Sequence, residues 1–285
     1  MSKPGFKFTA SLVLLITGIT FALAGQCRTQ PPRGKQPTAA QVFASISKDK
    51  DKYWTTSYNE VYKNAADLSV LRQGKLSGKR VPFEIARGPE AGRQIALTFD
   101  DGPHPGFTPQ ILRILRRNNV KATFFLVGMK AEQNPKLVLA ELGGGHAVGN
   151  HTYHHVNLTK IPKKYVAAEI DACGDVLQSI SGTRPHLFRP PGGDYDPTVA
   201  RISNKLGYTM VLWTDDPGDY ASPGQGVIDR RTLDRISDGG IILIHDGVQE
   251  TINLLPRLIQ ELKARGFTFV TIDEWLKPRR PEKNK

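Results

Sequence analysis

The sequence predicts an α/β fold, a distorted (β/α) barrel of about seven parallel strands that follows an N-terminal extension. Two observations carry this prediction. From Arg93 onward, short apolar runs alternate with amphipathic stretches, a pattern typical of parallel strands joined by helices. Polar residues suited to chemistry follow five of these runs, and parallel strands bring their carboxyl ends to one rim. With 285 residues, 39% of them hydrophobic, the chain can bury one sizeable core.

Each expected element has its own signal in the sequence. The apolar runs that predict strands are 94–99, 122–127, 147–149, 186–188, 209–213, 240–244 and 268–271. The amphipathic stretches that predict helices are 109–117, 135–142, 163–180, 197–206, 230–236 and 250–265. Thr108 is expected to cap the first helix and Asn134 the second. Seven strands favour a barrel, whole or distorted, over an open sheet.

The first 24 residues predict a targeting segment. Lys3 and Lys7 form a basic start, residues 8–24 carry no charge, and Ala22-Leu23-Ala24 fits a cleavage site. Whether this segment is cleaved or kept as an anchor, the remaining chain is expected to be exported: extracellular, periplasmic or membrane-anchored and facing outward. Cys27 also allows a lipoprotein, although Gln26 before it is larger than such sites favour. Residues 25–40 predict a linker, 41–92 an extension that packs on the main domain at 93–276, and 277–285 a basic tail.

The formal net charge of +12 predicts attraction to anionic envelope polymers and membrane surfaces. The basic residues are scattered or lie in tails, and the sequence has no nucleic-acid motif, so nucleic acid is not an expected partner. Cys27 and Cys173 are the only cysteines. We expect no disulfide between them, because it would only tie a tail to the domain, and we expect Cys173 to be a small buried side chain.

The residues suited to chemistry all come directly after expected strands. In chain order they are Asp100, Asp101, His151, His155, Arg189, Asp216, Asp219 and His245. His151 and His155 are four residues apart, a spacing that puts both rings on one face if the segment forms a helical turn. Two imidazoles and one carboxylate leave coordination positions open for water and substrate, as in a catalytic metal site. The pattern therefore predicts a metal-dependent hydrolase.

Asp100 and Asp101 are adjacent, so on an extended chain their side chains point opposite ways. One carboxylate is then free to bind metal while the other faces the substrate as a base. The alternatives are that this pair only forms a turn or helix cap, and that His151 and His155 are surface or packing residues. Among the remaining histidines, His146 is expected to be structural, and the His154 ring is expected to project away from the shared face, either exposed or packing. His104 is equally consistent with the cleft and with the turn.

The segment Arg189-Pro190-Pro191-Gly192-Gly193 combines rigid and permissive residues. Such a loop can present a backbone N–H to a developing oxyanion, and Arg189 can hold a carboxylate such as Asp100 in its charged form. His245 ends a strongly apolar run, and Asp216 and Asp219 belong to an adjacent loop of the rim. A carboxylate beside an imidazole favours its protonated form, which predicts a proton donor. The alternatives are a surface Arg before a tight turn and a core histidine.

Five motifs in order make the chain resemble the polysaccharide deacetylases of carbohydrate esterase family 4, the NodB-homology family. They are Thr98-Phe99-Asp100-Asp101-Gly102-Pro103, His151-Thr152-Tyr153-His154-His155, Arg189-Pro190-Pro191-Gly192-Gly193, Asp216-Pro217-Gly218-Asp219-Tyr220 and Leu243-Ile244-His245-Asp246. The resemblance covers residues 93–276, and the family fold is a distorted (β/α) barrel.

The resemblance also implies a role for each motif residue. Asp101, His151 and His155 would bind one divalent metal, zinc first, with cobalt, nickel or manganese as alternatives. Asp100 would be the base toward the attacking water, and His245 would protonate the leaving amine. Positioning and transition-state roles would fall to Arg189 for Asp100, Asp219 for His245, the Gly192 N–H for the oxyanion and Leu243 for the acetyl methyl.

The resemblance predicts removal of N-acetyl groups from N-acetylglucosamine units of an envelope or extracellular glycan. Peptidoglycan, chitin-type oligomers and poly-N-acetylglucosamine all remain open. Two positions depart from the family pattern: Tyr220, where Trp is common, and Gly192, where a larger residue is frequent. They bear on sugar specificity more than on chemistry. The alternatives are an O-acetyl esterase acting on acetylated xylan and an inactive carbohydrate-binding envelope protein.

Overall fold

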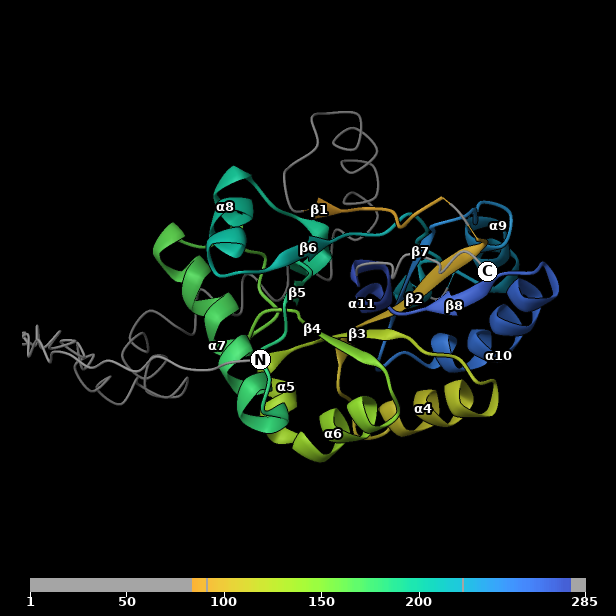
Figure 1. Ribbon diagram of the computed structural model, residues 1–285, viewed down its shortest axis with the longest axis horizontal. Helices are drawn as coiled ribbons and strands as arrows, with labels where there is room; N and C mark the ends of the chain where they lie inside the picture. The colour runs from red at the N-terminus through yellow and green to blue at the C-terminus, as the bar shows by residue number, and fades with distance from the viewer. Residues whose placement is uncertain (1–83, 91, 222, 278–285) are drawn as a thin grey trace, which may run out of the picture. The chain divides into compact units, whose positions relative to one another are not determined.

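The computed structural model describes residues 84–90, 92–221 and 223–277, and these residues form one sheet surrounded by helices (Figure 1). The sheet has eight strands in the described residues, in the order β1-β6-β5-β4-β3-β2-β7, with β8 paired to β2. Every strand pair is parallel. The strands are β1 (Glu84–Ile85), β2 (Gln94–Gly102), β3 (Thr123–Leu126), β4 (Ala147–Asn150), β5 (Leu187–Phe188), β6 (Thr209–Val211), β7 (Ile241–His245) and β8 (Thr268–Val270).

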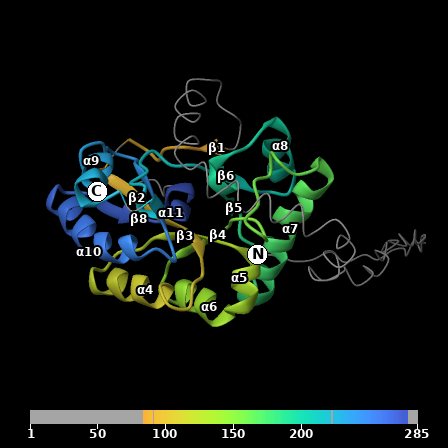
Figure 2. The same cartoon turned by 180° about the vertical axis from the view of Figure 1, so that it is seen from behind.

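Most of the helices lie on the outside of the strands in both views, whereas α11 lies within the ring of strands (Figures 1 and 2). The α-helices are α4 (Thr108–Arg117), α5 (Gly128–Gln133), α6 (Pro135–Gly143), α7 (Lys163–Ser181), α8 (Pro197–Lys205), α9 (Gln225–Thr232), α10 (Gln249–Ala264) and α11 (Ile272–Leu276). Two short 3-10 turns, η2 (Pro191–Gly193) and η3 (Asp219–Ala221), each follow a strand of the sheet. This arrangement confirms the predicted α/β fold with mostly parallel strands.

Strand β2 is the centre of the sheet because it pairs with three other strands. Its start, Gln94–Ala96, pairs with β8, and its end, from Thr98, pairs with β3. Its other edge pairs with β7 from Ala96 to Asp100. Period-2 alternation then sorts its side chains. Ile95, Leu97 and Phe99 pack in the main hydrophobic cluster with residues of α4 and α10, whereas Ala96 belongs to a separate inner cluster. Asp100 continues the inner row, which aims its carboxylate into the barrel.

The strand predictions hold at all seven places, and the differences have physical reasons. β1 was not predicted because it combines one charged and one apolar residue, Glu84 and Ile85, and so forms no apolar run; it lies within the expected extension at 41–92. Helix α9 begins earlier than the expected helix at 230–236, and the chain at 233–235 turns instead. The sequence prediction also missed α5 and α11, which have six and five residues.

Neither predicted cap makes a capping hydrogen bond, although Asn134 does occupy the N-cap position of α6. The Thr108 hydroxyl instead donates to Asp246 and accepts the N–H of His104, so it ties the start of α4 to the end of β7. Asn134 precedes α6, but its side chain donates to the carbonyl of Lys130 in α5. The Thr108–Asp246 bond joins residues far apart in the sequence, so the local sequence cannot reveal it.

Within the described residues, none of the helices combines the length and apolar character needed to cross a bilayer. The expected targeting segment at 1–24, the linker at 25–40 and nearly all of the basic tail lie outside the described residues, as does Cys27. Cys173 is fully buried in α7, where its thiol donates to the Leu126 carbonyl and burial raises its pKa to about 12. It is an inert packing residue, as predicted.

Candidate metal centre and active site

Strand β2 ends in a bulge that carries the two adjacent aspartates. The register with β3 shifts between Asp100 and Gly102, and Asp101 has a φ of 71°, which few L-residues adopt. The ammonium of Lys130 donates to the Asp101 carbonyl at 2.7 Å and supports this conformation. The prediction that the two carboxylates point opposite ways is therefore wrong. Both lie beside one imidazole, with oxygens 3.6 Å (Asp100) and 3.4 Å (Asp101) from Nε2 of His151.

The loop after β4 brings His151 and His155 together, but it is not helical. Thr152 has a φ of 64° and His155 a φ of 60°, so the predicted helical turn is wrong. The rings nevertheless come to within 4.9 Å of each other, centroid to centroid. The two rings converge, as the four-residue spacing suggested. The left-handed conformations of Thr152 and His155 bring them together, and not a helical turn.

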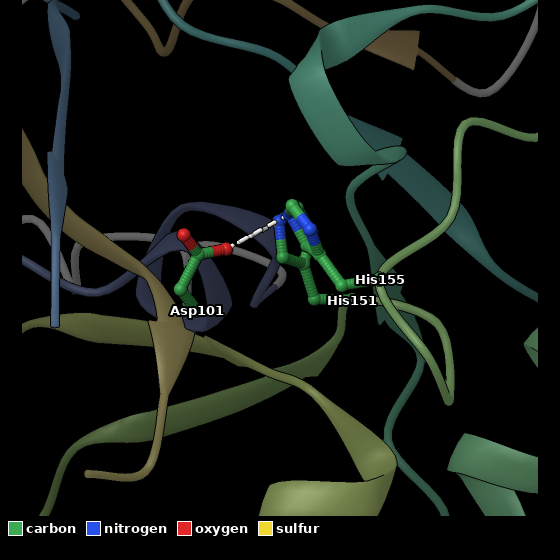
Figure 3. A group of neighbouring side chains, drawn as sticks. All are labelled: Asp101, His151 and His155. Atoms are coloured by element: carbon green, nitrogen blue, oxygen red, sulfur yellow. Dashed lines mark ion pairs between the residues drawn. The ribbon is translucent and has the colours of Figure 1, made fainter. Parts of the chain in front are cut away.

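Asp101, His151 and His155 form a group in which one ligand atom of each lies within 4.8 Å of the others. Oδ1 of Asp101 lies 2.9 Å from Nε2 of His155, and Figure 3 shows the carboxylate facing both rings. Within the described part of the chain, no other group of three or more His, Cys, Asp or Glu side chains has this arrangement.

The surroundings of this group fit a divalent cation. The Nδ1 of His151 bonds to the Arg189 carbonyl at 2.8 Å, which places the proton on Nδ1 and leaves the Nε2 lone pair facing Asp101. Oδ1 of Asp101 is buried, yet none of its contacts has hydrogen-bond geometry. Burial alone would raise the pKa of Asp101, but His155 and His151 hold that pKa well below its usual value. An ionised carboxylate and two imidazole nitrogens are a donor set that transition metals prefer.

Arg189 holds Asp100 at the bottom of the site. Its guanidinium is fully buried and donates to Asp100 Oδ1 at 2.7 Å and to Thr98 Oγ1 at 2.9 Å. It also donates to the carbonyls of Val211 and Leu212 at 3.1 and 3.0 Å. The ring of Phe125 lies 4.1 Å from its Cζ. A buried cation with this many acceptors is well compensated, and it fixes the orientation of the Asp100 carboxylate.

His245 ends β7 and is held by the fully buried Asp219. Asp219 accepts the Nδ1 proton of His245 at 2.8 Å and the His245 backbone N–H at 2.7 Å. The Thr251 hydroxyl of α10 donates to the same carboxylate at 2.5 Å. Burial would lower the pKa of His245, but the negative charges of Asp219, Asp101 and Asp100 raise it to about 10. The imidazole is therefore held in its proton-bearing form.

The other predicted residues occupy places around this centre. Gly192 has a φ of 62° inside the turn η2, three residues after Arg189. Leu243 is buried in the inner cluster, opposite Thr98 in the register of β2 and β7. The carboxylate of Asp216 accepts the Gly218 N–H within its own turn. Tyr220 packs edge-on against the His245 ring, 5.1 Å between centroids.

His146, His104 and His154 lie outside the metal group. His146 is buried, accepts the Ala122 N–H, and has its pKa lowered to about 4 by burial, so it is a neutral packing residue. The His104 ring accepts the N–H of Gly106 and belongs to the turn. His154 bonds to Glu169 of α7. Sequence reasoning missed Thr251 and Glu169, because both lie on helices whose polar residues look like an ordinary solvated face.

Comparisons with known proteins agree with this geometry. A family model described as polysaccharide deacetylase matches residues 87–211. The chain is 38% identical over 194 residues to a peptidoglycan-N-acetylglucosamine deacetylase of Bacillus cereus, covering 66% of this chain and 91% of that protein. It is also 38% identical over 206 residues to the peptidoglycan-N-acetylglucosamine deacetylase PgdA of Listeria monocytogenes, but spans only 43% of that relative's length. A chitooligosaccharide deacetylase of Azorhizobium caulinodans is 34% identical over 201 residues, covering 65% of this chain and 96% of that protein.

Solved structures show the same fold. The Bc1960 peptidoglycan N-acetylglucosamine deacetylase, crystallised with a substituted N-oxidanyl-benzamide, matches with a TM-score of 0.65 and 34% identity, over 68% of this chain and 92% of that one. BA3943 of Bacillus anthracis, a CE4 family pseudoenzyme, matches with a TM-score of 0.66 and 27% identity, over 70% and 71% of the two chains. Because such a fold also occurs in a pseudoenzyme, only the individual side chains of the site can indicate activity.

Proposed function

The chain belongs to the polysaccharide deacetylase family, carbohydrate esterase family 4 with the NodB homology domain, and we propose that it is an exported, metal-dependent N-deacetylase. Its substrate is a glycan containing N-acetylglucosamine, in the cell envelope or outside the cell. One observation carries the proposal: a carboxylate held by Arg189 and an imidazole held by Asp219 flank the Asp101, His151 and His155 group. A purely glycan-binding protein needs none of these three arrangements.

Asp101, His151 and His155 would hold the metal, for which we propose zinc, with cobalt, nickel or manganese as replacements. Bound there, a divalent cation lowers the pKa of water and polarises a carbonyl oxygen. Asp100 accepts the proton of the water that attacks the acetyl carbonyl carbon, while Arg189 keeps its second oxygen occupied. The Gly192 N–H is the proposed donor to the oxyanion. His245 gives its proton to the nitrogen as the amide bond breaks, because an amine leaves poorly as its anion.

The relatives named above act on peptidoglycan or chitooligosaccharide, and we propose peptidoglycan as the substrate here. Tyr220 and Gly192 are smaller than the residues common at those places in the family, and they bear on sugar specificity more than on the chemistry. An envelope substrate agrees with the predicted targeting segment at 1–24 and with the net charge of +12, which draws the protein to anionic envelope polymers.

The test is acetate release by the purified chain, with and without its N-terminal 24 residues. The panel contains peptidoglycan, chitin oligomers, poly-N-acetylglucosamine and acetylated xylan, each assayed with added zinc and with a chelator. We expect chelator-sensitive acetate release from an N-acetylated substrate. Release from acetylated xylan alone would replace the proposal with an O-acetyl esterase. Glycan binding without any acetate release or metal uptake would make the chain an inactive binding protein.

A further inference from the structure

The loop that carries both histidines of the metal group is held in a conformation that its own sequence disfavours. Thr152 and His155 have φ values of 64° and 60°, in the left-handed region that favours glycine. Non-glycine residues persist there only when the surrounding structure over-determines them. His151 is anchored directly, since it follows β4 and bonds to the Arg189 carbonyl. His155 is four residues further along the chain, so its position depends on what holds the loop.

Glu169 of α7 provides the most extensive of these contacts. Its Oε2 accepts the backbone N–H of His154 at 3.0 Å, and its Oε1 bonds to Nδ1 of the His154 ring at 2.8 Å. Its backbone carbonyl accepts the N–H of Tyr153 at 3.0 Å. One residue of α7 therefore bonds to two consecutive loop residues through three interactions, immediately before His155.

Glu169 is buried, so its carboxylate depends on these contacts for compensation. Its side chain is 1% exposed, and within the described residues no Lys or Arg lies within ion-pair distance of it. A buried carboxylate is costly unless hydrogen bonds compensate it, and here the His154 ring and backbone N–H supply them. Four further contacts support the same loop. The backbone N–H groups of Gly128 and Met129 donate to the carbonyls of Thr152 and Tyr153 at 2.9 and 3.0 Å. Asn150 accepts the Thr152 N–H at 2.8 Å, and the Tyr153 hydroxyl donates to Glu132 at 2.5 Å.

We infer that Glu169 is a positioning residue for the metal site: it clamps residues 153 and 154 onto α7 and so places His155 beside Asp101. The inference rests on the proposed metal site. His154 does not belong to the metal group. Its role in this inference is to link Glu169 to the ligand His155. Loss of the Glu169 side chain removes both bonds to His154 but keeps the backbone bond to Tyr153. His151 then stays in place while His155 is held less firmly, so metal affinity falls and the barrel itself stays folded.

The experiment compares zinc dissociation constants of the full chain, Glu169→Ala and Glu169→Gln, measured by competition with a chromophoric chelator. The matched control is Asp175→Asn, which removes a carboxylate of the same helix that pairs with Arg184, away from the loop. The thermal midpoint of each metal-free protein is recorded alongside, and Co²⁺ absorption spectra report the coordination geometry. Loss of a group that orients a ligand typically weakens metal binding by about 10–100-fold.

We expect that range for Glu169→Ala, with an altered Co²⁺ spectrum. Glu169→Gln keeps an acceptor for the His154 N–H and should fall between Ala and wild type, while Asp175→Asn should match wild type. A zinc affinity of Glu169→Ala within twofold of wild type would overturn the inference and leave the proposed function standing. If Glu169→Ala does not fold, an unchanged affinity of Glu169→Gln overturns it equally. Failure of the wild-type chain to bind any metal would overturn both proposals.

Discussion

Asp100 and His245 lie directly opposite each other in the register of the parallel strands β2 and β7. The backbone N–H of Asp246 donates to the Asp100 carbonyl at 2.8 Å, so sheet hydrogen bonds continue past both residues. The proposed base and acid are therefore spaced by the sheet itself and not by two separate loops. Such spacing is rigid, which suits proton transfers that depend on distances of a few tenths of an ångström.

Replacing Asp100 with Asn should remove activity and keep the metal. The proposed base lies outside the three ligands, so we expect kcat to fall by about 10²- to 10⁴-fold with zinc stoichiometry unchanged. Acetate release and metal analysis of the same preparation check this. Asp234→Asn, an exposed carboxylate, serves as the control. Full activity of Asp100→Asn would assign the base elsewhere.

Replacing Asp219 with Asn should move the alkaline limb of the pH–rate profile to lower pH. The proposed acid works only when His245 carries its proton, and neighbouring negative charges raise its pKa to about 10. Without the charge of Asp219 that pKa falls, so the proton is lost at lower pH and activity declines earlier as pH rises. A bound cation offsets the charge of Asp101 and Asp100, so the limb should lie below 10 even in wild type. The profile of kcat/KM against pH measures the shift, and an unmoved limb would argue against His245 as the acid.

Replacing Arg189 with Met should lower the free energy of unfolding as well as the activity. The guanidinium is the buried cation that compensates the Asp100 carboxylate, and breaking such a pair typically costs about 3–5 kcal/mol. Urea unfolding of the metal-free protein measures this loss. The double variant with Asp100→Asn should recover part of it, because no unpaired buried charge remains. If the double variant lost as much stability as the two single variants together, the pairing would be contradicted.

Replacing Glu141 with Gln should stabilise the protein at pH 8 and change little near pH 4. Glu141 is fully buried, its two oxygens lack hydrogen-bond partners among the described residues, and burial and then Asp246 raise its pKa well above the usual value. A raised carboxyl pKa means that folding favours the protonated form. The stability that Glu141 contributes is present below its pKa in the unfolded state, and it is lost as pH rises through its pKa in the folded state. Gln mimics the protonated state, so a gain of about 1–3 kcal/mol is expected at pH 8. Urea unfolding at both pH values checks it; equal stability at pH 8 would count against the burial argument.

Strand and helix positions were predictable because apolar runs mark them wherever an element is long enough. The run Ile241-Ile242-Leu243-Ile244 is apolar throughout and predicts a buried strand without further context. The two-residue strand β1 carries no such pattern, since its pairing with β6 comes from tertiary structure. The membership of residues such as His151, Arg189 and His245 in one site was also predictable, because parallel strands end at a common rim.

The local geometry of the site was not predictable, and individual residues show why. Asp101, Thr152 and His155 all adopt positive φ values that L-residues disfavour, so sequence reasoning assigned extended and helical geometry to them instead. Glu169 has the appearance of a solvent-facing acid in an amphipathic helix. Its burial follows only from the packing of α7 against the loop after β4. Strain and buried charge are tertiary properties, and both concentrate where function needs them.

The pairing of β2 with three other strands has a consequence for local unfolding of the protein. A strand whose backbone is bonded to β3, β7 and β8 at once cannot detach without breaking most of the sheet. Its amides should therefore exchange with deuterium only through global unfolding, far more slowly than those of the two-residue strand β1 at the edge. Asp100 and Asp101 lie at the end of this slowly exchanging strand. Thermal fluctuations at the edge of the sheet should therefore leave their arrangement intact.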